Sequence, residues 1–202
     1  EGPNPGERAL LVAGAFSTAG LMPVSNAAVW NGNSWAGLSG YELSQASGMG
    51  RWHPDGQREV LLACQLQAAG QPVTAAIIRR RGTSTSLLPD VTYASGVVAI
   101  QEGVLNGSPA AFLAGGIGVH QDGADFGTLV AWDGATWHPL FSGAGVPTFY
   151  STINWLAAET TAGDSTSILT LVGSPTTAIP DPKPWISTLR NGEWTHLGAV
   201  TG

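Results

Sequence analysis

Residues 128–143, TLVAWDGATWHPLFSG, decide the fold, because the same order of residues occurs a second time in the chain. The apolar run FLAGGI at 112–117 precedes this stretch, and the other copy reads LLVAGAF at 10–16 and NAAVWNGNSWAGLSG at 26–40. In both copies an apolar run reaches Asp-Gly or Asn-Gly, and a Trp-x-x-Leu sequence follows. Self-similarity of this kind is the sequence signature of a repeat protein.

Two weaker copies complete the pattern. One reads LTLVGS at 169–174 and WISTLRNGEWTHLG at 185–198. The other reads VLLACQ at 60–65 and TAAIIRRRGTSTSLL at 74–88, without either Trp. The turn glycines of the four copies recur about every fifty residues, at Gly32, Gly82, Gly134 and Gly192. We therefore divide a single domain, 1–202, into repeats of approximate bounds 9–40, 41–91, 92–143 and 144–202.

Each repeat predicts four short β-strands and no helix. A glycine-ended apolar run is one strand, and the run before the turn is a second. Asn-Gly and Asp-Gly predict a two-residue hairpin turn with both residues at positive φ, followed by a Trp-bearing third strand. A fourth candidate strand precedes the glycine-ended run of repeats two, three and four, at 43–52, 96–102 and 152–158. Four-stranded sheets with two partly apolar faces must pack face to face, which predicts an all-β protein, a β-propeller of four-stranded blades.

The repeats resemble kelch-like propeller blades, in the variant found in large bacterial extracellular proteins and in fungal cortical polarity-marker proteins. The resemblance covers nearly the whole chain and is most specific in the first and third copies. It implies an extracellular or cell-surface protein. The chain departs from strict kelch repeats, because the double glycine occurs only at Gly115–Gly116.

The resemblance also implies that the strand before each glycine-ended run is the innermost strand of its blade. Before the first such run the sequence offers only EGPNPGER, which is a poor strand. We therefore expect the first blade to lack its inner strand. The four repeats would then be part of a larger propeller, or an open arc completed by another chain.

Composition excludes some partners. The net charge is −6 and the pI is about 5.0, so the chain repels phosphate backbones and nucleic acid is not an expected partner. No apolar run approaches the roughly 20 residues that cross a bilayer, which predicts no membrane insertion. The single cysteine, Cys64, cannot form an intramolecular disulfide, and its apolar neighbours predict a buried thiol.

Three arginines and two tryptophans are the candidate binding residues. Strand alternation places Arg79 and Arg81 on one face and Arg80 on the other. Together they predict either a site for a carboxylate or acidic partner, or a solvated strand whose stems cover apolar surface, and the second interpretation is favoured. Trp52 and Trp155 lie outside the repeated Trp positions, so we expect them to be exposed and to stack on a glycan.

Metal and catalytic motifs are weak. Asp122 and Asp125 lie in the glycine-containing segment 120–127, which would suit a small calcium loop, although a solvated loop is the favoured interpretation. No His-x-x-x-His pair, phosphate-binding loop or nucleophile-elbow motif occurs, so we expect no enzyme and no cofactor.

The sequence therefore predicts a non-catalytic propeller that binds protein or glycan, or serves as a structural module. Two alternatives remain. The chain could be a fragment of a propeller hydrolase, lyase or oxidase whose catalytic residues lie partly outside it. It could also be an assembly subunit that self-associates through its incomplete first blade.

Overall fold

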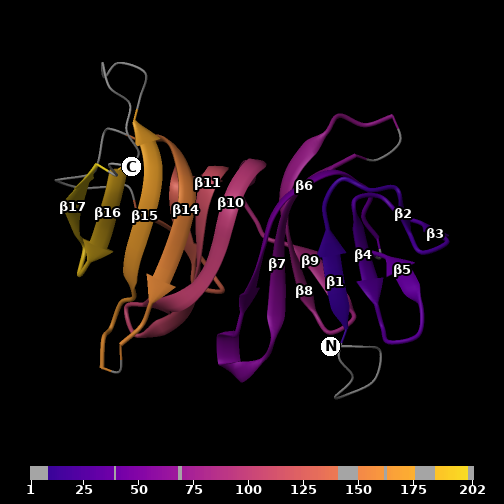
Figure 1. Cartoon of the computed structure of the whole chain (residues 1–202), viewed down its shortest axis with the longest axis horizontal. Coiled ribbons are helices and arrows are strands. Elements are labelled where there is room, and N and C mark those ends of the chain that lie inside the picture. Colours follow the sequence, from indigo (N-terminus) through magenta and orange to yellow (C-terminus); the bar gives the residue numbers. More distant parts are fainter. Residues whose placement is uncertain are drawn as a thin grey trace.

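The computed structural model describes residues 9–38, 40–67, 70–140, 150–161, 163–175 and 185–199. These residues form an all-β protein built of antiparallel sheets that follow one another along the chain (Figure 1). Sheet 1 contains β1 (Leu10–Ala13), β4 (Ala27–Trp30) and β5 (Trp35–Gly37). Sheet 2 contains β6 (Leu43–Trp52), β7 (Glu59–Leu66), β8 (Thr74–Arg81) and β9 (Ser84–Leu87), with the short 3-10 turn η1 (Pro54–Gly56) between β6 and β7.

Sheets 3 and 4 have the same order of four strands. Sheet 3 contains β10 (Val91–Leu105), β11 (Ser108–Gln121), β12 (Ala124–Trp132) and β13 (Trp137–Pro139). Sheet 4 contains β14 (Tyr150–Glu159), β15 (Ile168–Pro175), β16 (Trp185–Arg190) and β17 (Glu193–Ala199). Among the helices of the described residues, none has the length and apolar character needed to cross a bilayer. The all-β prediction is therefore confirmed.

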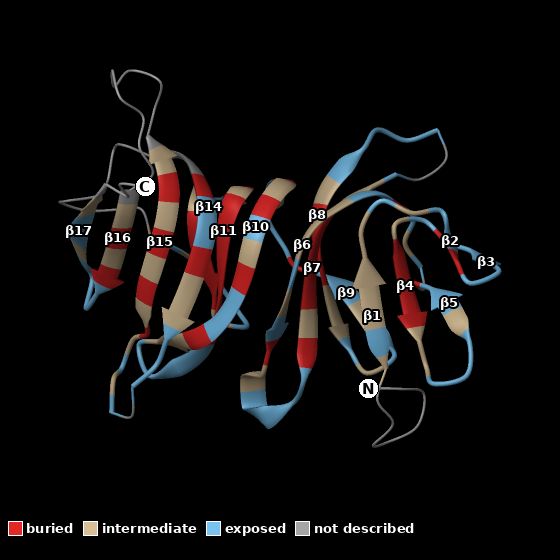
Figure 2. Ribbon diagram, viewed as in Figure 1, coloured by how far each residue is buried: buried red, intermediate tan, exposed pale blue. Residues whose placement is uncertain are grey.

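Sheet 1 has three strands because no described strand pairs with the free edge of β1. β1 is the counterpart of the second strands β7, β11 and β15. The expected absence of a first strand before β1 concerns residues 1–8, which lie outside the described residues. Figure 2 shows buried segments along β7, β11 and β15, whereas β1 is only half-buried or exposed. A small hairpin, β2 (Thr18–Ala19) and β3 (Met22–Pro23), packs on the face of sheet 1 that points away from sheet 2.

Alternating side chains join neighbouring sheets face to face. In β11, Leu113 belongs to the core between sheets 2 and 3, whereas its neighbour Phe112 belongs to the core between sheets 3 and 4. In β7, Ala63 packs toward sheet 3 and Cys64 packs toward sheet 1. Sheets 1 and 4 lie at opposite ends of the molecule (Figure 1), so the described strands do not form a closed ring.

The first strands of neighbouring sheets approach each other closely. β10 contacts both β6 and β14, although the three strands belong to different sheets. A Cβ atom on Gly48 of β6 would lie 2.7 Å from the carbonyl oxygen of Val97 of β10, so only glycine fits there. The same one-residue bulge recurs in each first strand. The bulged residues are Ser47, Val98 and Asn154.

The segment 120–127 is a hairpin and not the loop expected from the sequence. β11 and β12 continue through it and meet at a two-residue turn, Asp122–Gly123, in which both residues have positive φ. This geometry satisfies the backbone hydrogen bonds within the ladder, so the longer strands replace the loop.

The repeated Gly turns are of two kinds. Asn191–Gly192 is the predicted two-residue turn with positive φ at both positions. The prediction is wrong for the first and third copies, where Trp30 pairs with Trp35 and Trp132 pairs with Trp137 across four-residue loops. In these loops the side chain of the first residue, Asn or Asp, accepts backbone hydrogen bonds and closes the turn.

Candidate functional site

The arginine run at the end of β8 surrounds a buried carboxylate. Glu59 of β7 is 1% exposed. Arg79 Nη2 donates a hydrogen bond of 2.8 Å to Glu59 Oε1, and Arg79 Nε lies 2.7 Å from Oε2 in an ion pair. Arg81 Nη1 adds a longer ion pair of 3.6 Å to Oε1. The predicted shared face of Arg79 and Arg81 is confirmed, and the carboxylate that they meet belongs to the protein itself.

Trp52 is part of this buried cluster, so the expectation of an exposed Trp52 is wrong. It is 0% exposed, and the Arg79 guanidinium carbon lies 5.9 Å from its ring centroid, within cation–π range. On the sheet 3 side the indole packs under the turn at Gly134, where a Cβ atom would lie 3.2 Å from it. A glycan therefore has no access to the Trp52 ring in this structure.

Arg80 lies on the other face of β8, as alternation predicts. It shares a cross-strand row with Val60 of β7 and Arg51 of β6. Its side chain is half-buried, and burial lowers the pKa of the guanidinium. It makes no hydrogen bond or ion pair with any other described residue, in contrast to Arg79 and Arg81.

Trp155 is the exposed tryptophan that the sequence predicts. It lies on β14 and is 50% exposed. Cross-strand pairing places Val172 of β15 and then Ile186 of β16 beside it in one row. Leu156, the next residue, packs in the core toward sheet 3, so Trp155 points to the opposite face of sheet 4.

The row next to Trp155 carries hydroxyl groups. Ala157 pairs with Thr170, which pairs with Thr188, which pairs with Thr195. The corresponding face of sheet 3, with Phe112 in the corresponding row, is buried against sheet 4. The outer face of sheet 4 thus presents one large aromatic ring beside uncharged, hydrogen-bonding side chains.

The two aspartates proposed for calcium do not combine into one site. Asp122 occupies the turn of the β11–β12 hairpin, whereas Asp125 Oδ1 lies 2.7 Å from His120 Nδ1 across the strands. Among the described residues, no group of three or more His, Cys, Asp or Glu side chains is placed to hold a metal ion. The geometry favours the interpretation of a solvated hairpin.

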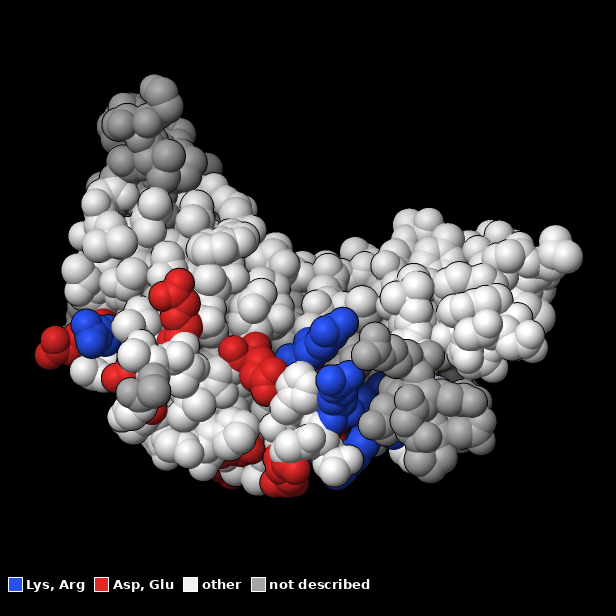
Figure 3. Space-filling view, turned by 60° about the horizontal axis from the view of Figure 1, so that its bottom comes forward, with Lys and Arg blue, Asp and Glu red and all other residues white. Residues whose placement is uncertain are grey.

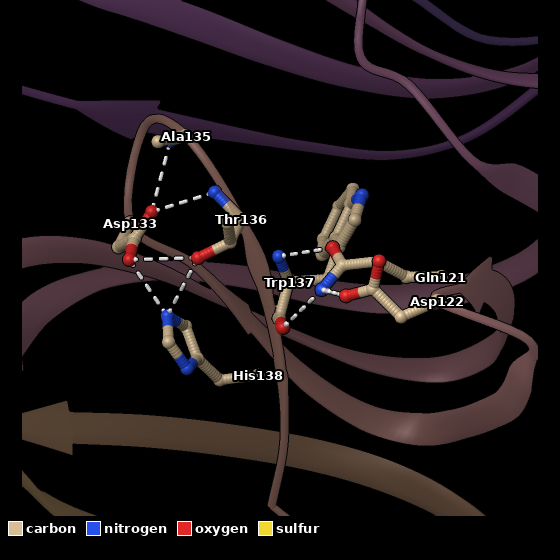
Figure 4. Close-up of polar contacts among 7 residues, drawn as sticks. All are labelled: Gln121, Asp122, Asp133, Ala135, Thr136, Trp137 and His138. Carbon is tan, nitrogen blue, oxygen red and sulfur yellow. Dashed lines mark hydrogen bonds and ion pairs between the residues drawn. The ribbon is translucent and has the colours of Figure 1, made fainter.

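Polar contacts around the third repeat hold its tryptophan pair in place (Figure 4). Asp133 accepts hydrogen bonds of 2.8 Å from the backbone amides of Ala135 and Thr136, and His138 Nε2 lies 2.7 Å from its Oδ2. Partial burial raises the pKa of Asp133, but the hydrogen bonds from His138 and then from Thr136 and Ala135 outweigh it and hold the pKa below its usual range.

The tryptophan pair itself is structural. The rings of Trp132 and Trp137 lie 5.0 Å apart and are buried against sheet 2. Trp137 Nε1 donates a hydrogen bond to the carbonyl of Pro89, in the connection between β9 and β10. The first repeat carries the same pair, Trp30 and Trp35, with centroids 5.3 Å apart. The repeated tryptophans therefore fill the space beside a sheet, as a large flat side chain can.

Two pairs that sequence spacing did not predict also come together. His53 Nδ1 lies 2.6 Å from Glu102 Oε2, which links sheets 2 and 3. Ser187 Oγ lies 2.7 Å from His196 Nδ1, but Ser187 is 0% exposed, so its hydroxyl is closed to a substrate. These partners are separated along the chain and meet through strand pairing or sheet packing, so local spacing carried no signal for them. No family model, curated protein or solved structure matches the chain.

Proposed function

We propose that the four sheets are blades of an incomplete β-propeller related to the kelch type. Three observations support this assignment. Alternate residues of each interior sheet pack against two neighbours, the first strands contact one another, and each first strand carries its bulge at the same place. Close glycine contacts between β6 and β10 are the expected result of sheets converging toward a common inner edge.

The protein acts in this proposal as a non-catalytic binding or structural module of an extracellular or cell-surface protein. The observation that carries it is the outer face of sheet 4. A face that is buried in the preceding sheet is here left with Trp155 half exposed. An exposed aromatic ring beside hydroxyl groups suits a protein hot spot or the face of a sugar ring.

The test is binding by a Trp155→Ala variant. A glycan array followed by a pull-down from the medium or cell-surface fraction identifies the ligand, and the variant should lose at least tenfold in affinity. Leu197→Ala is the matched control, because Leu197 is 62% exposed on the same sheet. Equal binding by the two variants would show that Trp155 is not part of the site. The absence of binding to any glycan or protein would overturn the proposal of a binding module.

The free edge of β1 supports a second candidate, self-association by strand addition. β1 pairs only with β4 among the described strands, and its residues are half-buried or exposed where their counterparts in β7 are buried. An unpaired edge is a template for another strand. Light scattering should then show a mass that grows with concentration, and Leu10→Lys at the exposed start of β1 should reduce it. A monomer at every concentration would exclude this candidate.

A further inference from the structure

Most of the basic side chains of this acidic protein gather at one end of sheet 2. Five of the eight Lys and Arg residues fall between positions 51 and 81. In Figure 3 they form one blue group near the middle of the molecule, with a single blue side chain far to the left. Arg51 is the second-last residue of β6 and Arg58 precedes β7, while the run 79–81 ends β8. Antiparallel pairing brings these three strand ends together.

The arginines on the two faces of sheet 2 differ in whether a carboxylate pairs with them. On the face toward sheet 3, Arg79 and Arg81 share the buried Glu59. On the face toward sheet 1, the row Arg51–Val60–Arg80 contains two cations and no acid. Alternation along the strands separates Glu59 from this row, so the one buried carboxylate nearby does not neutralise it.

Arg80 is the unusual member of the row. A half-buried guanidinium ordinarily has a carboxylate or a carbonyl group as a partner, because burial without one is costly. Neither Arg80 nor its neighbours Arg51 and Arg58 makes an ion pair or hydrogen bond within the described part of the chain. The acid nearest to Arg51 in sequence, Asp55, lies in η1 and is exposed. Among the described residues, no hydrogen bond or ion pair joins Asp55 to this row.

The repeat pattern indicates what kind of ligand fits. Arg80 stands two residues before its turn glycine, the position that Trp30 and Trp132 hold in the first and third repeats. The second repeat thus has a cation where the first and third have an aromatic ring, and the fourth repeat has Arg190 at this position. A sugar would need the ring as a stacking platform, whereas a carboxylate needs a planar, two-pronged donor, which arginine supplies.

We propose that Arg80 and Arg51 bind carboxylate side chains of an acidic segment of a partner protein, at the end of sheet 2 facing sheet 1. This site is separate from the Trp155 face of sheet 4, so an experiment can refute either binding site without affecting the other. Arg80 makes the specific contact with a carboxylate. Arg51 and Arg58 add electrostatic attraction, which weakens as the salt concentration rises.

The probe is a fluorescein-labelled hexaglutamate peptide, with hexaglutamine as its uncharged control, measured by anisotropy at 50 and 200 mM salt. We expect hexaglutamate alone to bind, with an affinity that falls several-fold at the higher salt. Arg80→Gln should weaken binding about tenfold or more, because bidentate charged hydrogen bonds are the strong ones. Arg190→Gln is the matched control, since Arg190 is an exposed arginine at the end of β16 in another sheet.

Arg80→Met separates binding from folding. It keeps an apolar stem and removes the charge, so the variant should unfold at the same or a higher temperature while peptide binding is lost. The proposal is overturned if hexaglutamate does not bind at 50 mM salt or if Arg80→Gln and Arg190→Gln bind equally well. Arg80-dependent binding of an oligogalacturonate in preference to the peptide would also overturn it, because the ligand would then be an acidic glycan.

Discussion

The Glu59–Arg79 pair allows a sharp test of the buried charges on the face of sheet 2 that points toward sheet 3. Replacing Arg79 by Leu leaves the Glu59 carboxylate fully buried with only the 3.6 Å contact to Arg81. Breaking a buried pair from one side costs about 3–5 kcal/mol. We expect the lower end, about 3 kcal/mol, because the Arg79 side chain is 29% exposed and Arg81 keeps part of the charge balance.

The double variant Glu59→Leu/Arg79→Leu should be far less destabilised than Arg79→Leu alone, since it buries no unpaired charge. Replacing a buried pair by apolar residues is often neutral, so we expect a net change within about 1 kcal/mol. The difference between the single and double variants is then the cost of the stranded carboxylate, and not the net contribution of the pair.

Urea unfolding followed by tryptophan fluorescence measures both changes, because Trp52 lies against Arg79. Thermal unfolding should agree, with the single variant losing about 6–12 °C at about 2–4 °C per kcal/mol for a chain of this size. Arg190→Leu, on an exposed site, is the control and should change stability by less than about 0.5 kcal/mol. A loss below 1 kcal/mol for Arg79→Leu, or a double variant as unstable as the sum of its singles, would refute the reasoning.

Three further outcomes follow from the packing. Gly48→Ala should destabilise the folded protein by about 1–3 kcal/mol in urea unfolding, because the backbone of Val97 blocks the new methyl group. Gly37→Ala should not, because its methyl group would make only ordinary contacts. Equal losses of stability in the two variants would contradict the close approach of β6 and β10. Burial raises the pKa of Cys64 to about 12, so a thiol reagent at pH 8 should label it only after unfolding, and rapid labelling of the native protein would show that it is accessible. The pKa of Asp133 is depressed in the folded state, so its stabilisation is present above about pH 4 and is lost as the pH falls further. Asp133→Asn should reduce this loss of stability at low pH. It should keep the turn, because Asn31 closes the same turn in sheet 1. An unchanged pH midpoint of acid unfolding would contradict this.

The sequence predicted those features that depend on local residues. Strand order within a repeat follows from apolar runs and turn residues, and the shared face of Arg79 and Arg81 follows from strand alternation. The turn at Asn191–Gly192 was predictable for the same reason. These features needed no knowledge of the neighbouring sheet.

Features that depend on another strand or another sheet were not predictable. Trp52 is buried because the turn at Gly134, more than eighty residues away, covers it. Glu59 pairs with Arg81 in the ladder, and its carboxylate reaches Arg79 one row away, which its sequence neighbours do not reveal. The strand extension through 120–127 follows from the pairing of β11 with β12, which the loop prediction did not include.

Among the described residues, the buried clusters join each sheet to the sheets next to it, so folding stability should behave as a linear chain of nearest-neighbour terms. Within this part of the chain, sheets 2 and 3 have a partner on both faces, whereas sheets 1 and 4 each have one main-sheet partner. The molecule should therefore open from its two ends inward, with amide exchange slowest in β7 and β11 and fastest in β1 and β17. A neighbour added at either end would slow exchange there first.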